Sequence, residues 1–175
     1  MNRHLSSAVA RLVCTLASAY VAFELLHDAS RRLEANAVAF ALGDLGVAGA
    51  SQVYGARILV RPSHSAPFLA TVTPSCSALG AVLAFVSIAL FMLHGPLPRR
   101  VLAVLVACAA VVVCNMLRIG LSVAVGVHSG AHAMVVFHDW VGTLFGLLSI
   151  LGGFMLFVFT LLPSNKRLLA AALGG

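Results

Sequence analysis

Long, uninterrupted runs of apolar residues constrain this chain more than any other feature. Strong runs cover about residues 7–26, 77–93, 101–117 and 140–162, and a weaker run covers about 35–50. A helix needs roughly 20 apolar residues to cross a bilayer, and its backbone groups must pair internally in lipid. Because the runs are continuous rather than alternating, they exclude a transmembrane barrel. The pattern predicts an all-α, polytopic transmembrane bundle of about five or six helices.

The composition also indicates a membrane protein. Of the 175 residues, 61% are hydrophobic and only 9% are charged, whereas soluble proteins carry about 25% charged residues. The net charge of +6 comes from short loop clusters, which are typical of topology signals and not of nucleic-acid binding. The four cysteines show neither a Cys-x-x-Cys pair nor a zinc pattern. We expect a single integral membrane domain over residues 1–175.

Polar segments divide the apolar runs. Residues 27–34 form the first predicted loop, and residues 127–137 form the last. The longest polar segment, residues 51–75, has β-branched stretches punctuated by prolines, which predicts a small extramembrane hairpin or structured loop. The weak run at 35–50 is short for a span, so we expect a tilted or partly interfacial helix there.

Basic pairs in the loops predict the orientation of the bundle. The pairs are Arg31-Arg32, Arg99-Arg100 and Lys166-Arg167. They fall on one side if all five runs span, and a basic side is normally cytoplasmic. The opposite, outer side then receives the 51–75 segment and the start of the run that follows it.

Three side chains that lipid disfavours lie at this outer face, each at the end of a different apolar segment. Cys76 opens the run after the 51–75 segment, and Pro74-Ser75 predicts a helix start that would favour the reactive thiolate. Arg118 ends a run, and a charge near the bilayer centre costs at least about 2.5 kcal/mol, so such residues usually face the protein interior or water. His138 begins the last run, and histidine is the most frequent general base.

Together these three residues predict a cysteine-nucleophile site. Such a site needs a base within hydrogen-bond reach and a third group that orients or stabilises charge, and an arginine can stabilise an oxyanion. Asn115 shares a helix face with Arg118 because the two are three residues apart. Cys114 is a rival nucleophile. The rival bases are His128, His132 and His64.

Two readings from other functional classes compete with the enzyme. In a non-catalytic assembly factor or subunit, Arg118 would reach the interface or pair with Asp139 or Asp44, and Cys76 would be incidental. In a small anion transporter, Arg118 would bind the anion, but the sequence lacks the inverted repeat that such a fold predicts. The sequence also lacks Gly-x-Ser-x-Gly, His-Glu-x-x-His and paired intramembrane aspartates, which argues against other intramembrane proteases.

Three short motifs, in this order, resemble the exosortase/archaeosortase family of membrane cysteine transpeptidases. They are Ser-Cys-Ser-Ala-Leu-Gly at 75–80, Asn-Met-Leu-Arg-Ile at 115–119 and Phe-His-Asp-Trp-Val-Gly at 137–142. The resemblance covers about residues 35–160. It departs from the family at Ala78, where glycine is usual. We expect the added methyl group to narrow the space for an approach to the backbone beside Cys76, or to mark a divergent subfamily.

The resemblance implies a reaction and a setting. Cys76 would attack a peptide bond in the C-terminal sorting signal (a short motif, a transmembrane helix and a basic tail) of an exported protein, which gives a thioester. His138 would serve as base and then as acid, while Arg118 would stabilise the oxyanion or hold the substrate. The supporting residues are Asn115, Ser77 and Asp139. A lipid or other cell-envelope component would resolve the acyl-enzyme, at the outer, periplasmic face of a prokaryotic inner membrane, and no metal or cofactor is required.

Overall fold

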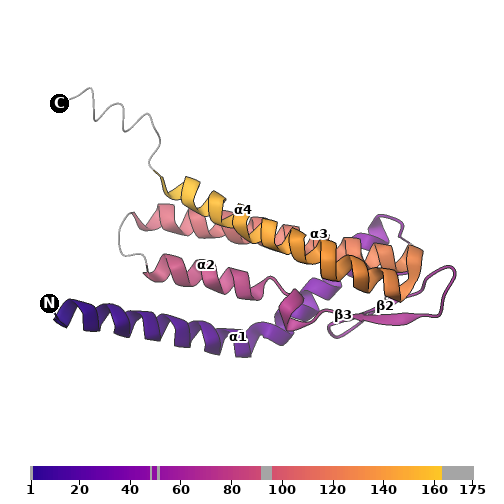
Figure 1. The fold of residues 1–175 in the computed structure, drawn as a ribbon, viewed down its shortest axis with the longest axis horizontal. Helices are drawn as coiled ribbons and strands as arrows, with labels where there is room; N and C mark the ends of the chain where they lie inside the picture. The colour runs from indigo at the N-terminus through magenta and orange to yellow at the C-terminus, as the bar shows by residue number, and fades with distance from the viewer. Residues whose placement is uncertain (1, 48, 51, 92–95, 163–175) are drawn as a thin grey trace, which may run out of the picture.

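The computed structural model describes residues 2–47, 49–50, 52–91 and 96–162 (Figure 1). Its helices are α1 (Asn2–Asp44), α2 (Leu79–Phe91), α3 (Leu97–Phe137) and α4 (Thr143–Leu161), with the short turns η1 (Pro74–Cys76) and η2 (His138–Gly142). Its strands are β1 (Gln52–Tyr54), β2 (Arg57–Val60) and β3 (Phe68–Thr71). The protein is mostly helical, as predicted, but the described residues form four α-helices rather than five or six.

The long helices lie lengthwise beside one another, and the sheet lies at one end of the bundle (Figure 1). The start of α1, the end of α2 and the end of α4 lie at the opposite end. Two helical stretches, Ser7–Asp44 and Leu97–Leu161, are long and apolar enough to cross a membrane, while α2 is shorter. Large apolar side chains such as Leu25, Phe40 and Trp140 are exposed, as helices that face lipid require.

One continuous helix replaces the first two predicted runs. Helix α1 passes through residues 27–34 without a break, so the predicted loop there is wrong. Asp28 and Arg31, three residues apart, form an ion pair along the helix surface, and Arg31 also donates to the main-chain oxygen of Val72 at 3.5 Å. Consequently Arg31-Arg32 lies at the sheet end of the bundle, away from Arg99-Arg100, and the prediction that both pairs share one side is also wrong.

The polar segment before Cys76 forms a three-stranded antiparallel sheet in the order β1-β2-β3. This confirms the predicted hairpin-like structure. Gly55, at φ 64°, lies in the tight connection between the first two strands, where a positive φ favours glycine. One hydrophobic core joins the sheet to α1 and α3; its fully buried members include Ala35, Ile58 and Val60. The sheet therefore fixes the start of the segment that leads to Cys76.

A single glycine reverses the chain within α3, and the residues after it lead through η2 into α4. Gly130 is the one non-helical residue inside α3, with φ 84° and ψ 178°, a conformation that is essentially restricted to glycine. A Cβ atom on Gly126 would lie 3.2 Å from the Met134 sulfur, so the chain on the two sides of Gly130 is in close contact. The predicted loop at 127–137 is thus a helical hairpin, and it returns His138 alongside α3.

A second hydrophobic core holds α2, α3 and α4 together farther from the sheet. The rings of Phe85 on α2 and Phe157 on α4 have centroids 6.0 Å apart. Gly153 allows α4 to approach α3, because a Cβ atom there would lie 2.6 Å from the Val111 side chain. The packing fixes α3 and α4 side by side, which aligns the two helices that carry the remaining site residues.

Candidate active site

The short turn η1 places Cys76 at the junction between the sheet and α2. Thr73 precedes the turn in an extended conformation and Pro74 begins it, because the fixed φ of proline suits the first turn of a helix. Cys76 N–H donates to the Thr73 carbonyl at 3.0 Å, and Ser77 N–H donates to the Pro74 carbonyl at 3.3 Å. Cys76 is therefore held by local hydrogen bonds and is 9% exposed.

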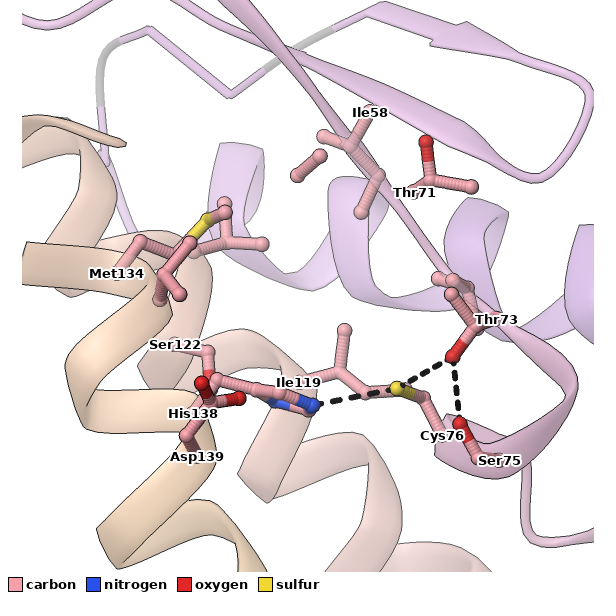
Figure 2. Close-up of a pocket in the computed structure, with 14 residues that line it drawn as sticks. Ile58, Thr71, Thr73, Ser75, Cys76, Ile119, Ser122, Met134, His138 and Asp139 are labelled. Carbon is pink, nitrogen blue, oxygen red and sulfur yellow. Dashed lines mark hydrogen bonds between the residues drawn. The ribbon is translucent and has the colours of Figure 1, made fainter. Parts of the chain in front are cut away.

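The structure brings Cys76 and His138 together from positions 62 residues apart in the chain. The Cys76 Sγ and His138 Nε2 atoms lie 3.3 Å apart (Figure 2). Both residues line a cavity of about 370 Å³ between the sheet, α3 and η2, and the exposed Asp139 lines it too. A thiol, an imidazole and open space for a substrate segment therefore meet at one point.

Asn115 and Arg118 bind the backbone of Cys76 rather than its sulfur. Asn115 Nδ2 donates to the Cys76 carbonyl at 2.9 Å, and Arg118 Nη2 donates to the same oxygen at 3.0 Å. Arg118 passes over Gly146, where a Cβ atom would lie only 2.8 Å from Nη1. The structure therefore brings the three predicted motifs together around Cys76, and Arg118 contacts the main-chain oxygen of this residue and not its sulfur.

The contacts of Arg118 weigh against the structural ion pair considered above. In the part of the chain that the structure describes, Arg118 forms no ion pair with Asp139, with Asp44 or with another carboxylate. Its Nε atom is buried and has no partner among those residues. One N–H group of the guanidinium therefore has no acceptor among the described residues and is covered by neighbouring atoms.

Glu34 is a site residue that the sequence analysis missed. Its Oε1 atom accepts hydrogen bonds from Ala78 N–H at 2.9 Å and from the Ser77 hydroxyl at 3.0 Å, and Glu34 is only 7% exposed. A carboxylate at the start of α2 satisfies a free N–H group and interacts favourably with the helix dipole. The sequence did offer a sign of this role, because a charged residue beside an apolar run is as unusual at Glu34 as at Arg118.

The neighbours of Glu34 also locate Ser77 and Ala78. The Ser77 hydroxyl lies between Glu34 and the Ser30 hydroxyl, which is 3.0 Å away. Ala78 is 4% exposed, so its methyl group, where the family usually has glycine, is accommodated by packing. The two residues after the nucleophile are therefore bound to α1.

Thr73 is a second residue that the sequence analysis missed. Its Oγ1 atom lies 2.9 Å from Cys76 Sγ and 2.9 Å from the Ser75 hydroxyl (Figure 2). No sequence pattern distinguishes the Thr73 and Ser75 hydroxyls from other hydroxyls in the chain. Their position beside Cys76 was the only sign of a role at the site. Cys76 Sγ thus has an imidazole on one side and a hydroxyl on the other.

The rival residues lie elsewhere. His64, His128 and His132 are exposed, and of the histidines described only His138 is within hydrogen-bond distance of Cys76 Sγ. Cys114 is half-buried and lines a second cavity of about 270 Å³, together with Asn115, Arg118 and Gly146. Ser75 lines both cavities, so the two adjoin at η1.

A comparison with protein families agrees with this arrangement. The family model for the transmembrane exosortase (Exosortase_EpsH) matches residues 3–162, which include all three motifs and extend beyond the 35–160 expected from the resemblance. No curated protein and no solved structure matches the chain significantly. The chain belongs to the transmembrane exosortase family.

Proposed function

We propose that this protein is a membrane-embedded cysteine transpeptidase or protease. It cleaves the C-terminal sorting signal of exported proteins through a thioester and transfers the product to a cell-envelope acceptor. The observation that carries the proposal is the 3.3 Å contact between Cys76 Sγ and His138 Nε2 beside a cavity of about 370 Å³. Membership of the transmembrane exosortase family supports the same reaction class.

The chemistry follows from the two atoms in contact. His138 Nε2 takes the thiol proton, and the sulfur of Cys76 attacks the carbonyl carbon of the scissile peptide bond. The C–N bond then breaks, and the imidazolium gives its proton to the leaving amine. An acceptor hydroxyl or amine, or water, loses a proton to His138 and attacks the thioester, which regenerates the thiol.

Side-chain donors stabilise the oxyanion in this mechanism. The backbone N–H groups of Cys76 and Ser77 already bind the Thr73 and Pro74 carbonyls, so the turn η1 does not offer them to the substrate. Arg118 would supply such a donor, as the resemblance implies; one of its nitrogens holds the Cys76 carbonyl, and its side chain lines the adjoining second cavity. A preorganised charged donor of this kind is worth most where water is excluded.

The proposed setting is the prokaryotic inner membrane, with the site toward the outer face. Arg99-Arg100 lies at the bundle end away from the sheet, as does Arg3 near the start of α1. Residues 166–167, a further basic pair, lie outside the described residues but follow α4 in the sequence. At the sheet end, Arg31 is paired with Asp28. Arg32, Arg57 and Arg61 also belong to the sheet end, so five basic residues at the other end or after α4 stand against four here, and the positive-inside rule supports an outer sheet end by this narrow margin.

A cleavage assay tests the proposal. The substrate is an exported reporter that ends in a sorting signal taken from the same organism, and intact mass reports the new C-terminus. We expect cleavage by the wild type and by Cys114→Ser, no cleavage by Cys76→Ala, and at least about 100-fold slower cleavage by His138→Ala. Hydroxylamine should release the reporter from the thioester on Cys76. Undiminished cleavage by Cys76→Ala would refute the proposal.

A further inference from the structure

The sulfur of Cys76 lies between two polar side chains, and only one of them has a role so far. His138 Nε2 is 3.3 Å from Sγ, and Thr73 Oγ1 is 2.9 Å from it. Figure 2 shows the two contacts reaching the sulfur from different sides, His138 from η2 and Thr73 from the segment that leads into η1. Thr73 and Ser75 also line the same cavity as Cys76.

The proton count of each hydroxyl limits the direction of these hydrogen bonds. Thr73 Oγ1 contacts both Cys76 Sγ and the Ser75 hydroxyl at 2.9 Å, but a hydroxyl has one proton to donate and can accept more than one bond. The proposed mechanism requires the thiol to donate its proton to His138 Nε2, which lies 3.3 Å away. A consistent chain therefore runs from Ser75 O–H to Thr73 O–H to the sulfur, and from the thiol S–H to Nε2.

The nearby backbone N–H groups do not donate to the sulfur of Cys76. The N–H groups of Cys76 and Ser77 are both used within the turn. Asn115 and Arg118 bind the carbonyl oxygen of Cys76. Among the residues that the structure describes, Thr73 thus carries the hydroxyl that lies within hydrogen-bond distance of Sγ and can donate to it.

We infer that Thr73 is a further catalytic residue, whose hydroxyl stabilises the thiolate of Cys76; the inference rests on the proposed cysteine mechanism. The S–H bond breaks and an N–H bond forms on His138, while the Thr73 proton stays on its oxygen and becomes a charge-assisted donor to the sulfur. Ser75 keeps the Thr73 hydroxyl oriented toward the sulfur. Attack on the substrate then moves the negative charge from the sulfur to the carbonyl oxygen.

Cysteine-resolved alkylation of the full-length protein in detergent tests this inference. All proteins carry Ser63→Cys, an exposed position between β2 and β3. Iodoacetamide is applied over a range of pH, and mass spectrometry reads Cys76 and this introduced thiol in the same sample, so that position 63 is the internal reference. The variants are Thr73→Val, which keeps the shape without the hydroxyl, Thr73→Ala, and Thr73→Ser, which restores the hydroxyl. Thr73 is exposed, and its carbonyl bond to Cys76 N–H is kept in every variant.

Loss of the hydroxyl should make the thiolate scarcer at neutral pH. We expect Thr73→Val and Thr73→Ala to slow Cys76 alkylation about tenfold at pH 7, because a hydrogen bond to a charged group is lost and higher nucleophilicity offsets only part of that loss. Their rate profiles should move to higher pH, while Thr73→Ser should keep the wild-type profile and the reference thiol at position 63 should react equally in all variants.

The other outcomes separate this inference from the proposed function. If Cys76 reacts faster than the reference thiol at position 63 and depends on His138, but Thr73→Val and Thr73→Ala leave its profile unchanged, the role of Thr73 is refuted and the proposed function stands. If Cys76 reacts no faster than the reference thiol and His138→Ala has no effect, the preformed pair of Cys76 and His138 is refuted, and the role of Thr73 with it.

Discussion

Replacement of Glu34 tests how far the site depends on its attachment to α1. Glu34 Oε1 accepts from Ala78 N–H at 2.9 Å and from the Ser77 hydroxyl at 3.0 Å. Both donors follow Cys76 directly, and Ala78 is only 4% exposed. Glu34→Ala therefore leaves a buried N–H group without an acceptor at the start of α2.

The expected loss can be worked from these contacts. An unsatisfied buried donor costs about 1–3 kcal/mol, and loss of a carboxylate near a helix N-terminus costs about 0.3–1 kcal/mol more. The Ser77 hydroxyl keeps Ser30 as a hydrogen-bond partner at 3.0 Å, so the loss of its hydrogen bond to Glu34 adds little to the cost. Glu34→Ala should therefore lower the free energy of unfolding by about 1–4 kcal/mol, which for a chain of this length lowers Tm by roughly 3–16 °C.

Glu34→Gln is the matched control. Its amide oxygen replaces Oε1 as the acceptor, and its amide group replaces Oε2, which is buried and has no partner among the described residues. The change in stability should stay within about 1 kcal/mol. Thermal unfolding in one detergent at one protein concentration measures all three proteins, and Cys76 alkylation reports on the site. The reasoning is refuted if Glu34→Ala unfolds at the wild-type temperature, or if Glu34→Gln is as unstable as Glu34→Ala.

Two further predictions concern the hairpin and the orientation. Gly130→Ala should lower the free energy of unfolding by about 1–3 kcal/mol, because φ 84° with ψ 178° is a conformation that alanine adopts only with strain. Thermal unfolding measures the loss, and Gly152→Ala, which has open space around its Cβ position, is the control. Equal Tm values for the two variants would contradict the argument. For orientation, Ser63→Cys is exposed between β2 and β3 and should react with a membrane-impermeant maleimide added outside intact spheroplasts. Reaction only after lysis would place the sheet on the inside.

Features that depend on local sequence were predictable. Continuous apolar runs gave helices because a backbone in lipid must pair with itself, and the β-branched, proline-punctuated segment before Cys76 gave the small sheet. Asn115 and Arg118 share a helix face, as their spacing requires, and both reach the same carbonyl oxygen. Pro74 begins a turn at the predicted position, although that turn is a short 3₁₀ helix and α2 begins only at Leu79.

The limits of α1 were not predictable from polarity alone. Residues 27–34 are polar enough to suggest a loop, but Leu, Arg, Glu and Ala favour helix, and Asp28 and Arg31 pair along the helix. Charge marks where a chain leaves lipid but does not mark where a helix ends. The same error misplaced Arg31-Arg32 relative to the site.

The sequence by itself determined the kind of molecule and the residues available for chemistry. The apolar runs set a helical membrane fold, and the order of Cys76, Arg118 and His138 within their motifs indicated the family. Tertiary structure alone decided what these side chains bind, because contacts across tens of residues depend on how helices and sheet pack. That packing set Arg118 on a carbonyl, Glu34 on the start of α2, and His138 within 3.3 Å of Cys76.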